Sequence, residues 1–203
     1  MRIVSRALAL VGGRARPGAR AVLAAVLACL ASGCGGAGAE AHPQTPALWP
    51  YTGDATKIFD DVIELPAVGY GIDRDAQPMQ DKRVRERTQI ADAVLRVRVT
   101  GVNALTEGAN GWLIACHTIE RLAGKRLPPP DFNLQVDAAG PAAGILRQFA
   151  TRLASGTFVV FVEEFAREGG LPGAQLHFHL AQDSPDEVIA IREAAAMGDA
   201  QSQ

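Results

Sequence analysis

Hydrophobic and polar residues recur along this chain with two different periods, and each period predicts one type of element. Apolar residues at every second position are typical of a β-strand, whereas apolar residues three or four positions apart are typical of an amphipathic helix. Alternation, or a run of β-branched and aromatic residues, predicts strands at residues 93–100, 112–119, 132–137, 157–165 and 176–180. Helical spacing predicts helices over residues 54–64, from about 141 to 153, and from 184 to about 197.

Turn-forming residues separate these segments. The Asn110-Gly111 pair predicts a hairpin between the first two strands. Residues 67–80 show no period and predict a loop, and residues 122–130 predict a connection that ends in three prolines. Residues 81–87 alternate in charge, which favours a solvated helical face over a basic binding patch.

Together these elements predict one α+β domain over residues 54–203, with about five mainly antiparallel strands and two or three helices. A helix between the third and fourth strands is the element order of an OB-like barrel. An open α+β sheet packed against two or three helices fits the order equally well. Neither fold identifies a function by itself.

The N-terminal region has a different pattern. Five arginines are the only charged residues before Cys34, and an apolar run follows them at residues 21–31. This run is about 11 residues long, whereas a membrane-spanning helix needs roughly 20. Positive charge ahead of a short apolar run is typical of an export signal.

The end of this run, Ala31-Ser32-Gly33-Cys34, resembles the lipobox of bacterial lipoproteins. The resemblance implies that residues 1–33 are a signal peptide and that Cys34 is acylated. Residues 34–53, rich first in glycine and alanine and then in proline, are then a flexible tether. Gly35 directly after the cysteine favours the outer membrane. Cleavage before Cys29 and an ordinary secretory signal are the two alternatives.

Charge and cysteine content narrow the function. All 22 acidic residues follow Cys34 but only 15 basic ones do, so the processed chain has a formal charge of −7. Such a surface is repelled by nucleic-acid phosphates, which makes a nucleic-acid partner unfavourable. With Cys34 acylated, Cys116 has no partner for an intramolecular disulfide, and its apolar neighbours predict a buried, unreactive thiol.

His177 and His179 are the strongest candidates for a site. They alternate with Leu176, Phe178 and Leu180, which predicts that both imidazoles share the solvent-facing side of one strand. Two such imidazoles can bind one metal ion, with His117 or Glu163 as the further donors available. The alternation alone also explains a structural pair of surface histidines, and we favour that interpretation.

Three other groupings carry weaker signals. Glu163 and Glu164 are neighbours on a strand, so they face opposite sides and do not form an acid–base pair. Cys116 and His117 are adjacent in sequence, which does not make a nucleophile–base dyad. Arg96 and Arg98 share a strand face and can bind an anion, although pairing with carboxylates of the next strand is the commoner outcome.

The sequence therefore predicts a non-catalytic lipoprotein of the bacterial envelope that needs no cofactor. Its expected location is the outer membrane, facing either the periplasm or the cell surface. The β-rich domain is expected to act as a binding or accessory module, with the membrane as one partner through the lipid anchor and an envelope protein as a possible second. The alternative is a small metal-binding protein or metal-dependent enzyme that uses His177 and His179.

Overall fold

The computed structural model describes residues 47–71, 78–105, 110–167, 169 and 171–201. Cys29 and Cys34 lie outside these ranges. The longer elements are the helices α2 (Lys82–Ile90), α3 (Ala143–Leu153) and α4 (Pro185–Gln201), and the strands β2 (Ala93–Leu105), β3 (Gly111–Gly124), β4 (Asp131–Asp137), β5 (Thr157–Ala166) and β6 (Ala174–Gln182). The shorter elements are α1 (Ala55–Ile58), the two-residue strand β1 (Val62–Ile63), and the 3-10 turns η1 (Leu65–Val68) and η2 (Pro78–Gln80).

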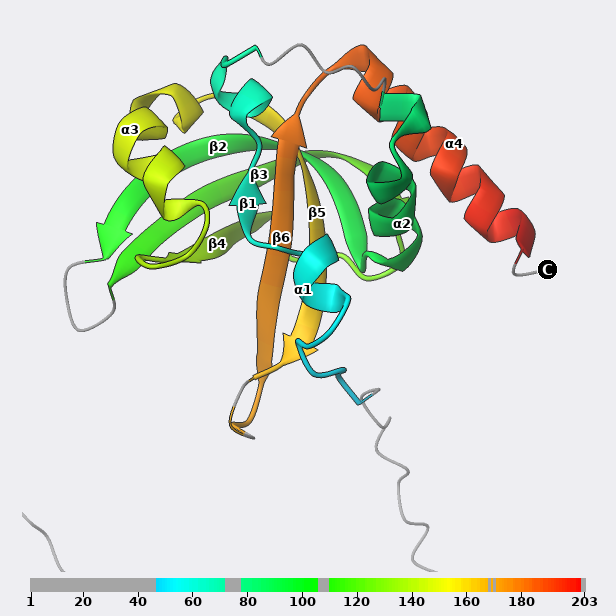
Figure 1. The fold of residues 1–203 in the computed structure, drawn as a ribbon, viewed down its shortest axis with the longest axis horizontal. Helices are drawn as coiled ribbons and strands as arrows, with labels where there is room; N and C mark the ends of the chain where they lie inside the picture. Colours follow the sequence, from blue (N-terminus) through cyan, green and yellow to red (C-terminus); the bar gives the residue numbers. More distant parts are fainter. Residues whose placement is uncertain (1–46, 72–77, 106–109, 168, 170, 202–203) are drawn as a thin grey trace, which may run out of the picture. The chain divides into compact units, whose positions relative to one another are not determined.

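The strands form one six-stranded sheet in the order β1-β6-β5-β2-β3-β4. Every neighbouring pair is antiparallel except β1 and β6, which are parallel. The predicted α+β class is confirmed, with one strand more than expected. The meander β2-β3-β4, then α3, then β5 beside β2, follows the OB-like order. The sheet curls as a half-barrel in which β4 comes close to β6, but β6 pairs with β1 (Figure 1).

Both faces of this sheet are covered. One face packs with α3 and η1 around a core of residues from β2 to β6, including Leu95, Ile114, Leu134, Val160 and Phe178. The other face packs with α1, α2 and α4 through a second buried cluster, including Phe59, Val84, Phe161, Phe165 and Ile191. In Figure 1, α3 lies on one side of the curled sheet while α2 and α4 lie on the other.

Most of the predicted elements are present. The five predicted strands correspond to β2 to β6, and the two later helices correspond to α3 and α4. Strand β4 shows the cleanest agreement, because its burial alternates at every residue. The last helix begins where predicted, and Ser184 caps it, since the Glu187 amide donates to the Ser184 hydroxyl at 3.2 Å. The helix then continues to Gln201, four residues beyond the predicted end near Met197.

The predicted helix over residues 54–64 is wrong. Only α1 is helical, and the chain then turns at Asp61, whose φ is +51°, to form β1 beside β6. The Ile58 carbonyl accepts from Arg87 Nε at 2.8 Å, and the Phe59 carbonyl accepts from the Tyr51 hydroxyl. These contacts satisfy carbonyls that a longer helix would have used internally.

Two further expectations need correction. Residues 122–124, expected in a connection, belong to β3 and pair with the start of β2. The face of β6 that carries His177 and His179 was expected to be wet, but both side chains are buried. An alternating pattern shows which residues are polar but not whether they are exposed to solvent. Here the two histidines are buried because carboxylates of the preceding segment, residues 60–64, pair with them. Within the described ranges, no helix combines the length and apolar character needed to cross a membrane.

Candidate functional site

The segment from Trp49 to Glu64, here called the covering segment, lies over β6 and the end of β5. It brings carboxylates next to the buried histidines of β6. Its first contact is made by the backbone of Trp49, whose carbonyl accepts from the Ala166 amide at 2.8 Å. Pro50 forms an isolated parallel bridge with Ala166. Trp49 through its backbone and Tyr51 through its side chain thus make the first contacts of this segment with the sheet.

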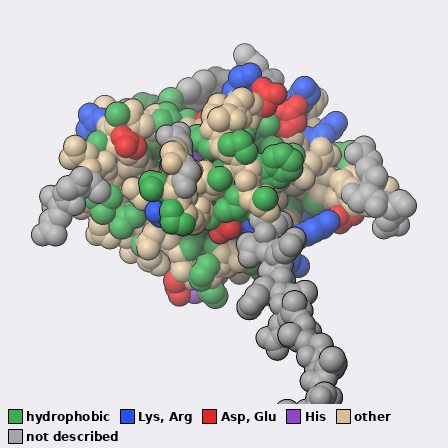
Figure 2. Space-filling view, turned by 90° about the horizontal axis from the view of Figure 1, so that it is seen from below, with side chains coloured by type: hydrophobic (Ala, Val, Ile, Leu, Met, Phe, Trp, Pro, Cys, Tyr) green, Lys and Arg blue, Asp and Glu red, His purple; other side chains and the backbone are tan. Residues whose placement is uncertain are grey.

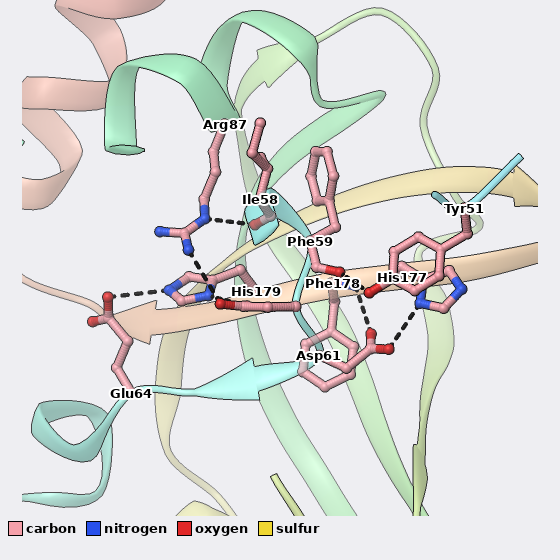
Figure 3. A network of polar contacts seen from close by, with 10 residues as sticks. Tyr51, Ile58, Phe59, Asp61, Glu64, Arg87, His177, Phe178 and His179 are labelled. Atoms are coloured by element: carbon pink, nitrogen blue, oxygen red, sulfur yellow. Dashed lines mark hydrogen bonds and ion pairs between the residues drawn. The ribbon is translucent and has the colours of Figure 1, made fainter. Parts of the chain in front are cut away.

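His177 is held by Asp61 and Tyr51. Its Nδ1 lies 2.8 Å from Asp61 Oδ2, while Asp61 Oδ1 accepts from the Phe178 amide at 3.0 Å. The Tyr51 ring stacks on the imidazole at a centroid distance of 3.5 Å (Figure 3). The Phe165 ring meets the same imidazole edge-on. With 6 % of its surface exposed, His177 is fixed by contacts on several sides.

His179 uses both ring nitrogens within the protein. Nε2 lies 3.1 Å from Glu64 Oε1 (Figure 3). Nδ1 lies 2.7 Å from Asp60 Oδ1. Burial, with 4 % of its surface exposed, opposes the charged ring, but the hydrogen bonds to Asp60 and Glu64 outweigh it and raise the pKa of His179. An imidazole between two carboxylates donates from both nitrogens, and this requires the protonated ring.

Asp60 links this imidazole to α2. Arg87 Nη2 lies 3.6 Å from Asp60 Oδ2, and the guanidinium is almost fully buried. Burial alone would raise the pKa of Asp60, but the hydrogen bond to His179 and the positive charges of His179 and Arg87 hold that pKa below its usual range. The side chains of Arg87, Asp60, His179 and Glu64 therefore form a chain of opposite charges. This chain connects α2, the covering segment and β6, and it stabilises their packing.

The metal donors considered from the sequence are not assembled. His117 lies on β3, which is separated from β6 by the two strands β5 and β2. Its Nδ1 lies 2.7 Å from Asp131 Oδ1. Glu163 is the cross-strand partner of His177 and shares its face, but its carboxylate accepts from the Asp92 amide. Among the described residues, no group of three or more His, Cys, Asp or Glu side chains is placed to hold a metal ion.

Glu163 is the most perturbed acid of this region. Burial of the carboxyl is the largest influence and the charge of Asp92 adds to it, so that the pKa of Glu163 is raised to about 7. Glu164 faces the other side of the sheet, as predicted, and lies 3.5 Å from Arg126. The sequence carried no signal for the perturbation, because Asp92 is 71 residues away along the chain.

A pocket of about 350 Å³ opens beside Glu163. Its walls come from the covering segment, the end of α2 and the end of β5: Trp49, Pro50, Thr52, Asp54, Ala55, Ile58, Phe59, Ile90, Glu163 and Phe165. Trp49 and Ile90 are largely exposed at the rim, with 76 % and 49 % of their surfaces accessible. A mainly apolar pocket with one perturbed carboxyl is the usual form of a small-ligand site.

A second and larger hollow, of about 770 Å³, lies between the end of α2, the end of β3 and the C-terminal half of α4. Its lining is mainly polar, with Arg121, Lys125 and Asp199 at its edges. Aromatic rings and an acid with a raised pKa come together in the pocket beside Glu163, which makes that pocket the better candidate despite its smaller size.

The remaining candidates have structural explanations. Arg96 lies 2.8 Å from Asp183 and 3.9 Å from Glu120 of the neighbouring strand, so the predicted pairing with carboxylates is confirmed for this arginine. Cys116 is buried, and burial raises the pKa of its thiol to about 12, which agrees with the predicted unreactive thiol. Arg98 and His117 are on the exposed part of the sheet.

The chain matches no protein-family model, and neither curated proteins nor solved structures give a match.

Proposed function

We propose that this chain is a lipid-tethered binding module of the bacterial envelope, anchored in the outer membrane through Cys34. The observation that carries the proposal is the Ala31-Ser32-Gly33-Cys34 sequence after a short apolar run. Anchoring through several acyl chains is stable, because each buried CH₂ contributes about 0.8 kcal/mol. The Gly- and Pro-rich residues that follow give the domain a spacer from the bilayer.

A binding role is supported by the chemistry of the described domain. Its two buried histidines are engaged by carboxylates, and we assign them to holding the covering segment on β6. The pocket beside Glu163 offers mainly apolar walls and the carboxyl groups of Asp54 and Glu163, which suits recognition of a small ligand. The proposed activity is therefore ligand capture close to the membrane, with the anchor fixing the location and the pocket providing the contact.

The anchor is tested by replacing Cys34 with serine in cells that produce the full chain. We expect the wild type in the outer-membrane fraction, with a mature N-terminal peptide whose mass includes acyl chains. Cys34→Ser should lose that mass and leave the membrane fraction, because serine cannot form the thioether. Cys29→Ser is the matched control and should behave as wild type.

Two results would contradict the proposal. A wild-type chain with an unmodified N-terminus would remove the anchor, and a Cys34→Ser protein that stays in the membrane fraction would show that something else holds it there. Loss of anchoring in Cys29→Ser alone would move the acylated residue to that position.

A further inference from the structure

The pocket beside Glu163 combines aromatic walls with acidic polar groups. Trp49, Phe59 and Phe165 supply rings, and Ile58 and Ile90 supply aliphatic surface. Its charged lining residues are Asp54 and Glu163, and none of the lining residues is a lysine or an arginine. Figure 2 views the domain from the side on which β5 ends and shows hydrophobic side chains exposed across that surface.

The two acids are not equivalent. Asp54 is exposed and lies 2.8 Å from Lys57, so its charge is largely compensated. Asp92 is the acidic group that affects Glu163 most, and Arg126 is a cation nearby, 4.0 Å from Asp92 and 3.5 Å from Glu164 on the opposite face of β5. Arg126 is thus engaged by Asp92 and Glu164, and no lysine or arginine lines the pocket, so an ionised Glu163 leaves a negative potential at that end.

We propose that this pocket binds a small organic cation, with its ammonium group beside Glu163 and its aromatic or aliphatic body against Trp49 and Phe165. Aromatic faces attract cations as well as apolar surface, so both parts of such a ligand find favourable contacts. A volume of about 350 Å³ is at the lower end of the range for ligand pockets, which selects a small molecule. This inference rests on the proposed binding role and names its ligand class.

Binding of a cation also depends on the ionisation of Glu163. The charges that influence this carboxyl are those of Asp92 just before β2, Arg126 after β3 and Glu164 on the opposite face of β5, and His177 is its cross-strand neighbour on β6. Because the pKa of Glu163 is about 7, its carboxyl is partly protonated near neutral pH when the pocket has no ligand. A bound cation favours the carboxylate, so affinity should increase as the pH rises through that value, with release of a proton.

The inference is tested with the full chain, purified in mild detergent, and with 2-phenylethylammonium as the probe. Trp49 reports on the pocket, and Trp112→Phe removes the only other tryptophan, which lies on β3. We expect the probe to change Trp49 fluorescence with an affinity at least about tenfold higher than that of the uncharged analogue 2-phenylethanol. The preference should weaken one pH unit below the Glu163 pKa and strengthen one unit above it.

Glu163→Gln removes the charge but keeps an oxygen that can accept from the Asp92 amide. It should abolish the preference for the cation while leaving binding of the alcohol unchanged. Glu164→Gln is the matched control, since it removes the same charge from the opposite face of the strand, and it should retain the preference.

Equal affinity for the two probes would overturn the inference and make the pocket a general apolar site. Binding of neither probe, or an equal loss in Glu163→Gln and Glu164→Gln, would overturn it as well. If Glu163→Gln fails to fold, the pH dependence in the wild type decides alone, and a flat profile counts against the inference. The mass of the N-terminal peptide in the same preparation tests the anchor separately, so failure of the ligand leaves the result on Cys34 intact.

Discussion

At the scale of single residues, Asp61 has the most demanding position in the covering segment. Its φ of +51° is unusual for a residue with a side chain, and Asp and Asn tolerate this region best after glycine. From that conformation its carboxylate reaches both the His177 ring and the Phe178 amide, while its own amide donates to the Phe178 carbonyl at 2.9 Å. One residue thus sets the turn and extends the pairing of β1 with β6.

Asp61→Ala should destabilise the domain by about 2–4 kcal/mol, because it removes a charged hydrogen bond and a backbone contact and adds strain at a positive φ. The free energy of unfolding from urea denaturation measures the change. Asp61→Asn keeps the tolerance of the left-handed region and one acceptor oxygen, so its loss should be clearly smaller. Equal losses in the two variants would show that the carboxylate charge, and not the conformation, dominates.

Among the helices and strands, the sequence predicted those whose buried residues follow the spacing of the element itself. Strand β4 and helix α3 have apolar residues at the spacing of their buried faces, and the sequence predicted them. Strand β5 is buried on both faces over residues 158–162, and its run of β-branched and aromatic residues predicted it. The helical spacing of Ile58, Phe59, Val62 and Ile63 was misleading, because partners on α2 and β6 decide how that segment folds.

The candidate site was less predictable than the fold for the same reason. His177 and His179 were recognised, but their carboxylate partners lie more than 110 residues earlier in the chain. The pocket is formed by three segments that come together only in the folded chain, and Glu163 acquires its raised pKa there. A single sequence gives no distance between such segments, so these contacts could not be inferred.

We expect the stability of helix α2 to depend on its N-cap residue, Asp81. The Asp81 carboxylate accepts from the Arg83 amide at 2.8 Å, and the helix carries Arg87 to Asp60 and Ile90 to the pocket rim. Asp81→Ala should cost about 1 kcal/mol in the free energy of unfolding. Asp81→Ser restores an acceptor and should recover most of the loss; no difference between the two variants would mean that packing, and not the cap, fixes this helix.

At the scale of the whole domain, the perturbed groups predict how stability varies with pH. Glu163 has a pKa raised from 4.5 to about 7, so its protonated form favours folding and that contribution is lost as the pH rises between those values. The raised pKa of His179 acts in the same sense, from 6.5 upward. The lowered pKa of Asp60 acts at the acid end, where stability is lost as the pH falls below 3.8. The stability maximum should therefore lie on the acid side of neutrality.

Glu163→Gln should flatten the pH dependence of unfolding between 4.5 and 7, because glutamine does not titrate. Urea denaturation at a series of pH values gives the measurement, with Glu164→Gln as the control that keeps the wild-type slope. A Glu163→Gln profile as steep as that of the wild type would assign the dependence to other groups.

The covering segment also determines how the domain responds to mechanical force. Tension applied on the N-terminal side of Trp49 is transmitted first to the contact between Trp49 and Ala166, then to the Tyr51 stack, and then to the two-residue strand β1 at the sheet edge. These contacts carry the force one after another, and the long strands β5, β2 and β3 carry it only after them, because they lie further from the β1 edge of the sheet. The covering segment would therefore peel away before the remaining sheet is strained, leaving β6 and its two histidines exposed to water.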